Sequence, residues 1–117
     1  MSHPTELRYS RAERVLHVAF DDGATFDLPA ELLRVESPSA EVQGHGADGK
    51  TLVSGRAHVN ITAILPEGNY AVRLVFDDQH DTGIYSWTYL RELGERRSEL
   101  WDAYLAALAA AGLGREP

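Results

Sequence analysis

The sequence contains no cysteine, and this absence excludes several kinds of chemistry. Without thiols the chain has no disulfide bond, no thiolate nucleophile and no Cys–His catalytic pair. Thiolates are also the usual ligands of structural zinc, so a zinc site of the common kind is excluded as well. We therefore expect the fold to be held together by its apolar core.

Long apolar runs are missing too. No stretch approaches the ~20 consecutive apolar residues that a membrane-spanning helix needs. The opening residues 1–6 lack the basic and then apolar layout of a secretion signal. These two absences predict a cytoplasmic protein with no membrane partner.

Basic residues are few: the chain has 11 of them against 18 acidic residues, a net charge of −7. This surface would repel a phosphate backbone, so we expect no nucleic acid partner. The length of 117 residues, with 44% apolar and 25% charged residues, fits one folded domain spanning residues 1–117.

The first two thirds of the chain read as strands and turns. Alternating apolar residues and glycine-containing turns predict two hairpins, one near residues 15–28 and one near 57–76. Residues 5–9 form a short opening strand, and Pro29 occupies the first position of a short helix. A long surface loop is expected from Glu36 to Gly55, where serine, glycine, aspartate and proline dominate.

The last third reads as helical. We expect one helix from Ile84 or Ser86 to Leu93, ended by Gly94, and a second near 98–112 that Trp101 and Leu105 anchor to the sheet. Residues 113–117 are expected to be a frayed tail. Strands followed by helices predict an α+β fold, an antiparallel sheet of two hairpins packed against C-terminal helices.

One segment combines an acidic turn containing a histidine with a run of aromatic residues, at residues 76–94. This segment resembles the signature of the gamma-butyrobetaine hydroxylase-like N-terminal domain. The resemblance covers most of the chain, and its most specific parts are Gly68-Asn69-Tyr70 and Gly83-Ile84-Tyr85-Ser86-Trp87. That family occurs as a stand-alone domain in many bacteria and also fused to iron- and 2-oxoglutarate-dependent oxygenases. The resemblance implies a binding or accessory role for a stand-alone bacterial member.

The resemblance also indicates where a zinc site would lie in this chain. In metal-binding members, a Leu-Arg pair precedes Cys-Pro-Cys-x-x-Cys, and these cysteines hold one zinc ion with a histidine that corresponds to His80. Here Leu33-Arg34 is followed by Ser37, Ser39 and Val42 at the cysteine positions. Serine hydroxyls are poor zinc ligands and valine is none, so we expect a degenerate zinc site and no cofactor.

The candidate binding residues lie in the same segment: Asp77, Asp78, His80, Asp81, Tyr85 and Trp87. His80 has three interpretations: a turn residue that is solvated or bonded to the nearby aspartates, a contact in a ligand or partner site, or a metal ligand. Tyr85 and Trp87 are interpreted as core residues on a helix or as an exposed patch that contacts a partner.

The sequence predicts no enzyme. No histidine has an acid two residues later, as the iron-binding triad of the oxygenases requires. Ser54 and Ser86 lack the context of a catalytic nucleophile. Two hypotheses remain: a protein-interaction or accessory module with a protein partner, and alternatively a small-molecule or metal-ion (zinc or iron) binding protein that uses the acidic turn at His80.

We predict that the folded protein is purified without stoichiometric zinc and that a chelator leaves its thermal midpoint unchanged, because His80 alone cannot organise a tetrahedral site. Elemental analysis and thermal melts check this. About one zinc or iron per chain, lost together with stability in a His80→Ala variant, would contradict it and would make Asp77, Asp78 and Asp81 candidate ligands.

Overall fold

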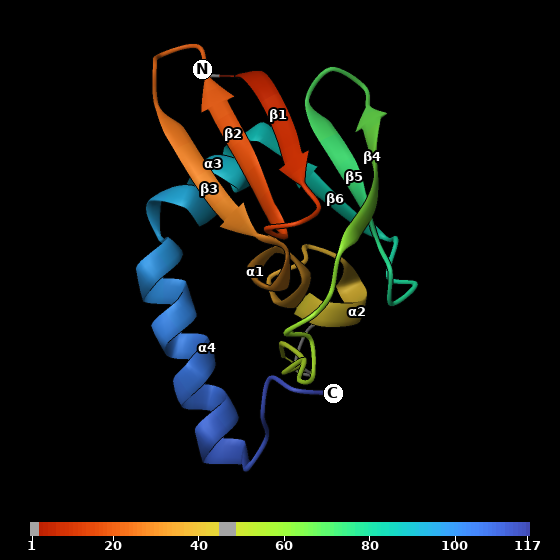
Figure 1. The fold of residues 1–117 in the computed structure, drawn as a ribbon, viewed down its shortest axis with the longest axis vertical. Coiled ribbons are helices and arrows are strands. Elements are labelled where there is room, and N and C mark those ends of the chain that lie inside the picture. Colours follow the sequence, from red (N-terminus) through yellow and green to blue (C-terminus); the bar gives the residue numbers. More distant parts are fainter. Residues whose placement is uncertain (1–2, 45–48) are drawn as a thin grey trace.

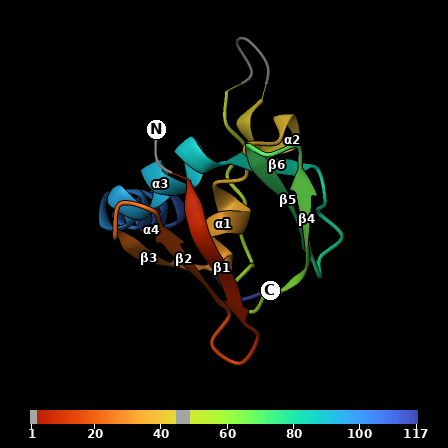
Figure 2. The same cartoon turned by 90° about the horizontal axis from the view of Figure 1, so that it is seen from above.

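A computed structural model describes residues 3–44 and 49–117. It has two three-stranded antiparallel sheets, of order β1-β2-β3 and β4-β5-β6, together with four helices in the described part of the chain. The α+β class is therefore confirmed, although the two hairpins lie in two sheets rather than one. In Figures 1 and 2 the two sheets stand beside each other, and α1 lies at their base between them.

The two long helices come last, as expected, and two short helices separate the strands of the first sheet from those of the second. Their bounds are β1 Pro4–Ser10, β2 Val15–Phe20, β3 Thr25–Pro29, α1 Ala30–Val35, α2 Ala40–Gln43, β4 Ile61–Glu67, β5 Ala71–Phe76, β6 Gly83–Ser86, α3 Trp87–Glu95 and α4 Arg97–Ala111. None of the described helices is long and apolar enough to cross a membrane.

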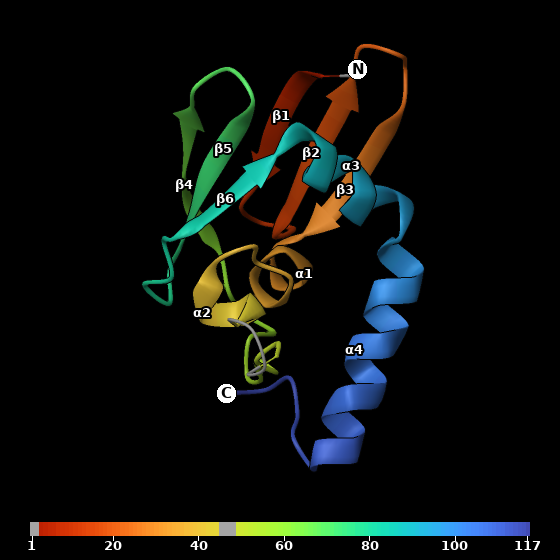
Figure 3. The same ribbon diagram turned by 180° about the vertical axis from the view of Figure 1, so that it is seen from behind.

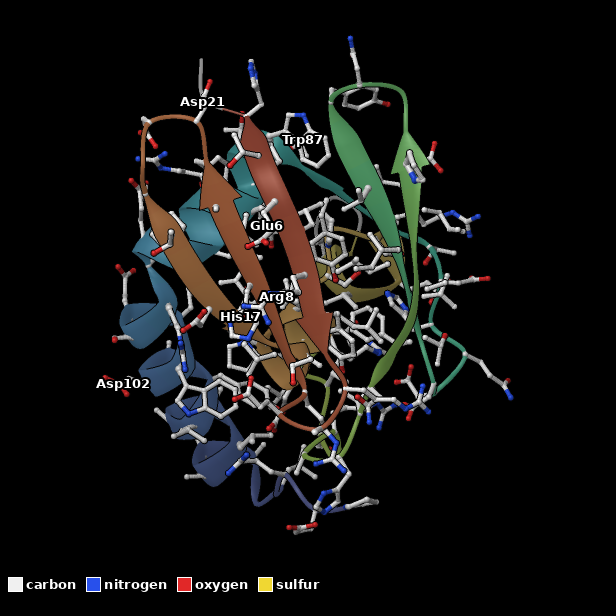
Figure 4. The ribbon with its side chains drawn as sticks, turned by 45° about the horizontal axis from the view of Figure 1, so that its top comes forward. Glu6, Arg8, His17, Asp21, Trp87 and Asp102 are labelled. Carbon is white, nitrogen blue, oxygen red and sulfur yellow. The ribbon has the colours of Figure 1, made fainter. Side chains whose placement is uncertain are left out.

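Both sheets bury their apolar side chains in the same core. Period-two alternation places Leu16, Val18 and Phe20 of β2 inward, and Leu74 and Phe76 of β5 meet them in the same cluster. Helix α1 fills the space between the sheets with Leu32 and Leu33, and α3 covers it with Leu90 and Leu93. The outer face of the first sheet carries Glu6, Arg8 and His17 (Figure 4).

A side-chain bridge at the edge of this core ties the two sheets together. The hydroxyl group of Tyr9 on β1 bonds the side-chain oxygen of Asn60, and it accepts the backbone N–H of Ile61 at 3.1 Å. The start of β4 is thereby fixed to the first sheet. The preceding residues 57–60, which the sequence predicts to be strand, are not part of β4.

The strand β6 is the main departure from the sequence prediction. Residues 84–86 are not helical; Gly83–Ser86 pairs with β5, with Ala71 opposite Ser86 and Val72 opposite Tyr85. Ser86 then starts α3, because its side chain accepts the N–H of Tyr89 at 3.1 Å. The spacing of apolar residues allows Tyr85 to belong to a helix or to a strand. The pairing of β6 with β5 makes it a strand residue.

Other boundaries shift for local reasons. Pro29 is the residue before α1 rather than its first, and its ψ of 142° is extended. Gly94 does not end α3, which continues to Glu95. A Cβ atom at Gly94 would lie 2.4 Å from the Phe26 ring, so glycine is required there because α3 packs closely on β3. The loop from 36 to 55 contains the short helix α2.

Helix α4 extends away from the sheets (Figures 1 and 3) and is held by a small second cluster of Val35, Tyr104 and Leu108. Trp101 is partly buried and packs against both clusters. Leu105, however, is 39% exposed and does not anchor the helix as predicted. The buried stripe follows positions 101, 104 and 108, and Leu105 lies outside it.

The tail makes defined contacts where fraying was expected. The N–H groups of Gly55 and Ala57 donate to the carbonyl oxygens of Gly114 and Arg115, both at 3.0 Å. The guanidinium group of Arg115 also bonds the carboxylate of the buried Glu31 at 2.8 Å. Figure 1 shows the C-terminus returning beneath α1 and α2.

We predict that Leu108→Ala lowers the free energy of unfolding by about 2–4 kcal/mol, because this side chain is only 3% exposed and its loss leaves a cavity. The matched variant Leu105→Ala, on the exposed side of the same helix, should change it by less than about 1 kcal/mol. Chemical denaturation measures both. Equal losses in the two variants would show that the packing of α4 is assigned wrongly.

Candidate functional site

The turn between β5 and β6 sets the position of His80. Its backbone N–H donates to Oδ1 of Asp78 at 3.2 Å, and its carbonyl oxygen accepts the N–H of Phe76 at 3.0 Å. Gln79 adopts a positive φ of 73°, which reverses the chain tightly. The imidazole is therefore directed inward, and only 5% of His80 is exposed.

The segment between α1 and α2 faces this turn. Ser37 is fully buried, and its Oγ lies 2.8 Å from Nε2 of His80. On the other side of the imidazole, Nδ1 lies 3.2 Å from a carboxylate oxygen of Glu41. Since an ionised carboxylate only accepts, Nδ1 carries the proton and donates to Glu41, and Nε2 accepts the Ser37 hydroxyl.

Two further hydroxyl groups close the network. Thr82 donates to the second carboxylate oxygen of Glu41 at 3.2 Å, and Oγ of Ser39 lies 2.7 Å from the Thr82 hydroxyl. The N–H of Ser39 in turn donates to Oγ of Ser37 at 3.3 Å. We call these five side chains, Ser37, Ser39, Glu41, His80 and Thr82, the polar ring; it joins residues 37–41 to residues 80–82.

The electrostatics of the ring keep its imidazole neutral. Burial lowers the pKa of His80, and the positive charge of Arg34 lowers it further, while Glu41 acts in the opposite direction with a smaller effect. A neutral imidazole with one donor and one acceptor nitrogen is the form that this geometry requires.

The donor set does not fit the zinc ion of the metal-binding relatives. Ser37 and Ser39 offer neutral hydroxyl oxygens that are already engaged in the ring, and Val42, which is 1% exposed, offers no donor atom. Both nitrogens of His80 are within hydrogen-bond distance of protein oxygens. In this protein hydrogen bonds join residues 37–41 to His80. In the metal-binding members that the sequence resembles, a zinc ion bound by thiolates is expected to make this connection.

Ser37, His80 and Glu41 have the order of a serine nucleophile, a base and an orienting acid. Such an arrangement acts in catalysis only when the hydroxyl group can reach a substrate carbonyl. Ser37 is 0% exposed, and a Cβ atom at the neighbouring Gly83 would lie 2.5 Å from its Oγ. The nucleophile position is thus enclosed by protein, and the geometry supports a structural role for these three side chains.

The predicted aspartates separate into different environments. The side chain of Asp77 is on the surface and accepts the N–H of Asn60 at 3.1 Å. Asp81 is exposed, and its carboxylate lies 4.0 Å from Arg73. Asp78 is partly buried between Arg34 and Arg56. The imidazole of His80 contacts Ser37 and Glu41. Its bond to an aspartate runs from its backbone N–H to Asp78.

The two aromatic candidates differ in exposure. Tyr85 is 0% exposed, and its hydroxyl group donates to the carbonyl oxygen of Leu33; burial raises its pKa. It is not available to a partner. Trp87 is partly exposed between the two sheets (Figure 4), where its Nε1–H donates to the carbonyl oxygen of Asn69 at 2.9 Å.

Sequence reasoning missed several residues that the structure brings to this region. Glu41 and Thr82 complete the polar ring, and Arg34 and Arg56 bind Asp78. Arg34 belongs to the Leu33-Arg34 pair, and Glu41 lies within the spacing that separates the zinc-binding cysteines of relatives. Arg56 is 22 residues from Asp78, and no sequence motif indicated that the two side chains meet.

A separate hollow lies between α4 and the extended residues 50–53. We call it the apolar groove; its volume is about 250 Å³, and Val35, Leu52, Val53, Leu100, Ala103, Tyr104 and Ala107 provide its apolar lining. Its charged residues, Lys50 and Glu36, bond each other at 2.7 Å. The groove therefore presents an apolar surface with no net charge.

The fold and the polar ring define a small α+β domain. In it a partly buried hydrogen-bonded network joins the region between the first two helices to the turn between β5 and β6. The chain belongs to the family described as gamma-butyrobetaine hydroxylase-like, N-terminal, whose model matches residues 7–91. Comparison with curated proteins gives no match.

Solved structures of relatives cover the chain widely. Two NMR solution structures match all of it with a TM-score of 0.86; one is 53% identical and matched over 87% of its own length, the other 45% identical and matched over 92%. A crystal structure from Acidithiobacillus ferrooxidans ATCC 23270, of a protein of unknown function in the DUF971 family, is 41% identical with a TM-score of 0.67. This match covers 79% of the present chain and 92% of the relative.

We predict that wild-type protein loses stability relative to a His80→Gln variant as the pH falls below the ordinary histidine pKa of about 6.5. The folded-state pKa of His80 is lowered, so in this range the unfolded chain binds more protons and acid favours unfolding. Hydrogen bonds to Asp27 and Glu13 raise the pKa of His17, so protonation of His17 favours the folded state. This contribution is the same in wild type and variant and cancels in the comparison.

Denaturation midpoints measured between about pH 5 and 7 check this difference. Parallel stability profiles of the two proteins would show that His80 does not titrate differently in the folded and unfolded chains.

Proposed function

We propose that this protein is a non-catalytic protein-binding module and that the apolar groove is its docking surface. The observation that carries the proposal is the groove itself, an open apolar hollow beside a helix whose exposed residues from Ala103 to Ala111 are uncharged. Grooves with an apolar lining accept the apolar side chains of partner segments.

The polar ring supports this proposal indirectly. It fixes the segment that follows α1, and Val35 and Glu36 at the end of that helix line the groove. Tyr104 forms the opposite wall and donates its hydroxyl to the carbonyl oxygen of Val53 at 2.6 Å. The groove is thus held by two elements whose positions are fixed before any partner binds, which lowers the entropy lost on binding.

The occupant that fits is an apolar segment of a partner protein with basic residues beside it. The groove lining requires apolar side chains, because a charge placed there would lose its hydration without gaining an opposite partner. The net charge of −7 favours a basic flank, and Asp102 points from α4 into solvent (Figure 4).

We predict that Ala107→Arg weakens partner binding at least about tenfold, since it places a charge and a long side chain in the groove. The matched control Ala109→Arg adds the same charge on the opposite side of α4 and should bind as wild type. Partners captured from an extract of the source cells are identified by mass spectrometry, and the purified partner is then titrated against all three proteins.

Three results would overturn the proposal. If wild type and Ala107→Arg bind the partner with equal affinity, the partner does not bind in the groove. If Ala107→Arg and Ala109→Arg lose affinity equally, the added charge and not the groove is responsible. Self-association of the wild-type chain that Ala107→Arg abolishes would make a second copy the occupant. Thermal melts of the variants, both at exposed positions, verify that they fold.

A further inference from the structure

Two arginines meet on one carboxylate oxygen. Nε of Arg34 donates to Oδ2 of Asp78 at 2.7 Å, and Nε of Arg56 donates to the same oxygen at 2.6 Å. Burial alone would raise the pKa of Asp78, but hydrogen bonds from Arg34 and from the His80 amide outweigh burial and lower it. Asp78 is therefore ionised, and two guanidinium charges face one carboxylate charge.

Arg34 lacks a full set of acceptors. Its side chain is 9% exposed, and among the described residues its Nη1 is a buried donor without a hydrogen-bond partner. A buried donor left unpaired on a charged group destabilises a protein, because the group has lost its hydration without gaining a partner. Such a group is a candidate for satisfaction by an acceptor that comes from outside the chain.

A second cavity opens beside these arginines. Its volume is about 340 Å³, and Arg34, Arg56, Thr51 and Ser54 contribute polar groups to its lining, while Val42 and Leu52 contribute apolar ones. Arg56 is held in place because its Nη1 donates to the carbonyl oxygen of Ser54 at 2.8 Å. The cavity thus has a wall with two guanidinium groups, hydroxyl-bearing residues beside it and an apolar wall.

We propose that this cavity binds a small organic carboxylate through Arg34 and Arg56. The planar guanidinium groups offer paired N–H donors that match the two oxygens of a carboxylate. The carboxylate of the ligand would accept hydrogen bonds from guanidinium N–H groups that Asp78 does not occupy, and the apolar wall would contact its carbon chain. This site is distinct from the apolar groove, although residues 51–53 line both.

The charges around the cavity favour a monoanionic group over phosphate. Glu41 also lines it, and His80, the remaining titratable group of the lining, is neutral because its pKa is lowered. With Glu41 directed toward His80 and Thr82, the net charge near the ligand is small. A dianion would therefore meet more repulsion than a carboxylate does.

The test is a titration of the full-length ¹⁵N-labelled protein with sodium acetate, followed by amide chemical shifts. We expect saturable shifts at residues 51–56 and at Arg34, and none with acetamide, the neutral analogue, or with sodium chloride at equal ionic strength. Arg56→Gln should weaken acetate binding at least about tenfold, because it removes a charged donor.

Arg96→Gln is the matched control: it makes the same charge change at an exposed residue between α3 and α4 and should bind as wild type. If Arg56→Gln does not fold, Arg56→Lys keeps the charge, loses the planar pair of donors and should also weaken binding. The proposal is overturned if phosphate gives saturable shifts and acetate does not, if chloride reproduces the acetate shifts, or if the folded Arg56 variant binds unchanged.

Discussion

The hydrogen bonds between Ser37, His80 and Glu41 are the constraint on which the arrangement around the site depends. They join two segments about forty residues apart in sequence, the connection after α1 and the turn between β5 and β6. In zinc-binding relatives a metal is expected to make this connection. Here neutral hydroxyl groups, an imidazole and a carboxylate make it. The bond between Ser37 and His80 is buried away from competing water, whereas Glu41 closes the ring from the surface.

The ring has consequences for both neighbouring hollows. Because it fixes the end of α1, Arg34 points toward Asp78, and Val35 and Glu36 reach the apolar groove. Residues 51–53 separate the groove from the arginine-lined cavity and contribute to both. Two surfaces of different chemistry, one apolar and one lined by arginines, therefore share residues 51–53.

Much of the fold could be predicted because its signals are local. Strand alternation located both hairpins, and the spacing of Leu100, Tyr104 and Leu108 located α4. Errors arose where distant contacts decided the outcome. Tyr85 fits a helix or a strand by spacing, and pairing with β5 made it a strand; Gly94 resembles a helix end, but it is glycine because Phe26 lies against it.

By itself the sequence determined the fold class, the family and the loss of the thiolate ligands, because composition, periodicity and motif spacing are properties of the chain alone. Only the tertiary structure decided the partners of His80, the exposure of Leu105 and the meeting of Arg34 with Arg56 on Asp78. Those features depend on which segments pack together, and no local pattern encodes the direction of a side chain toward a residue that is distant in sequence.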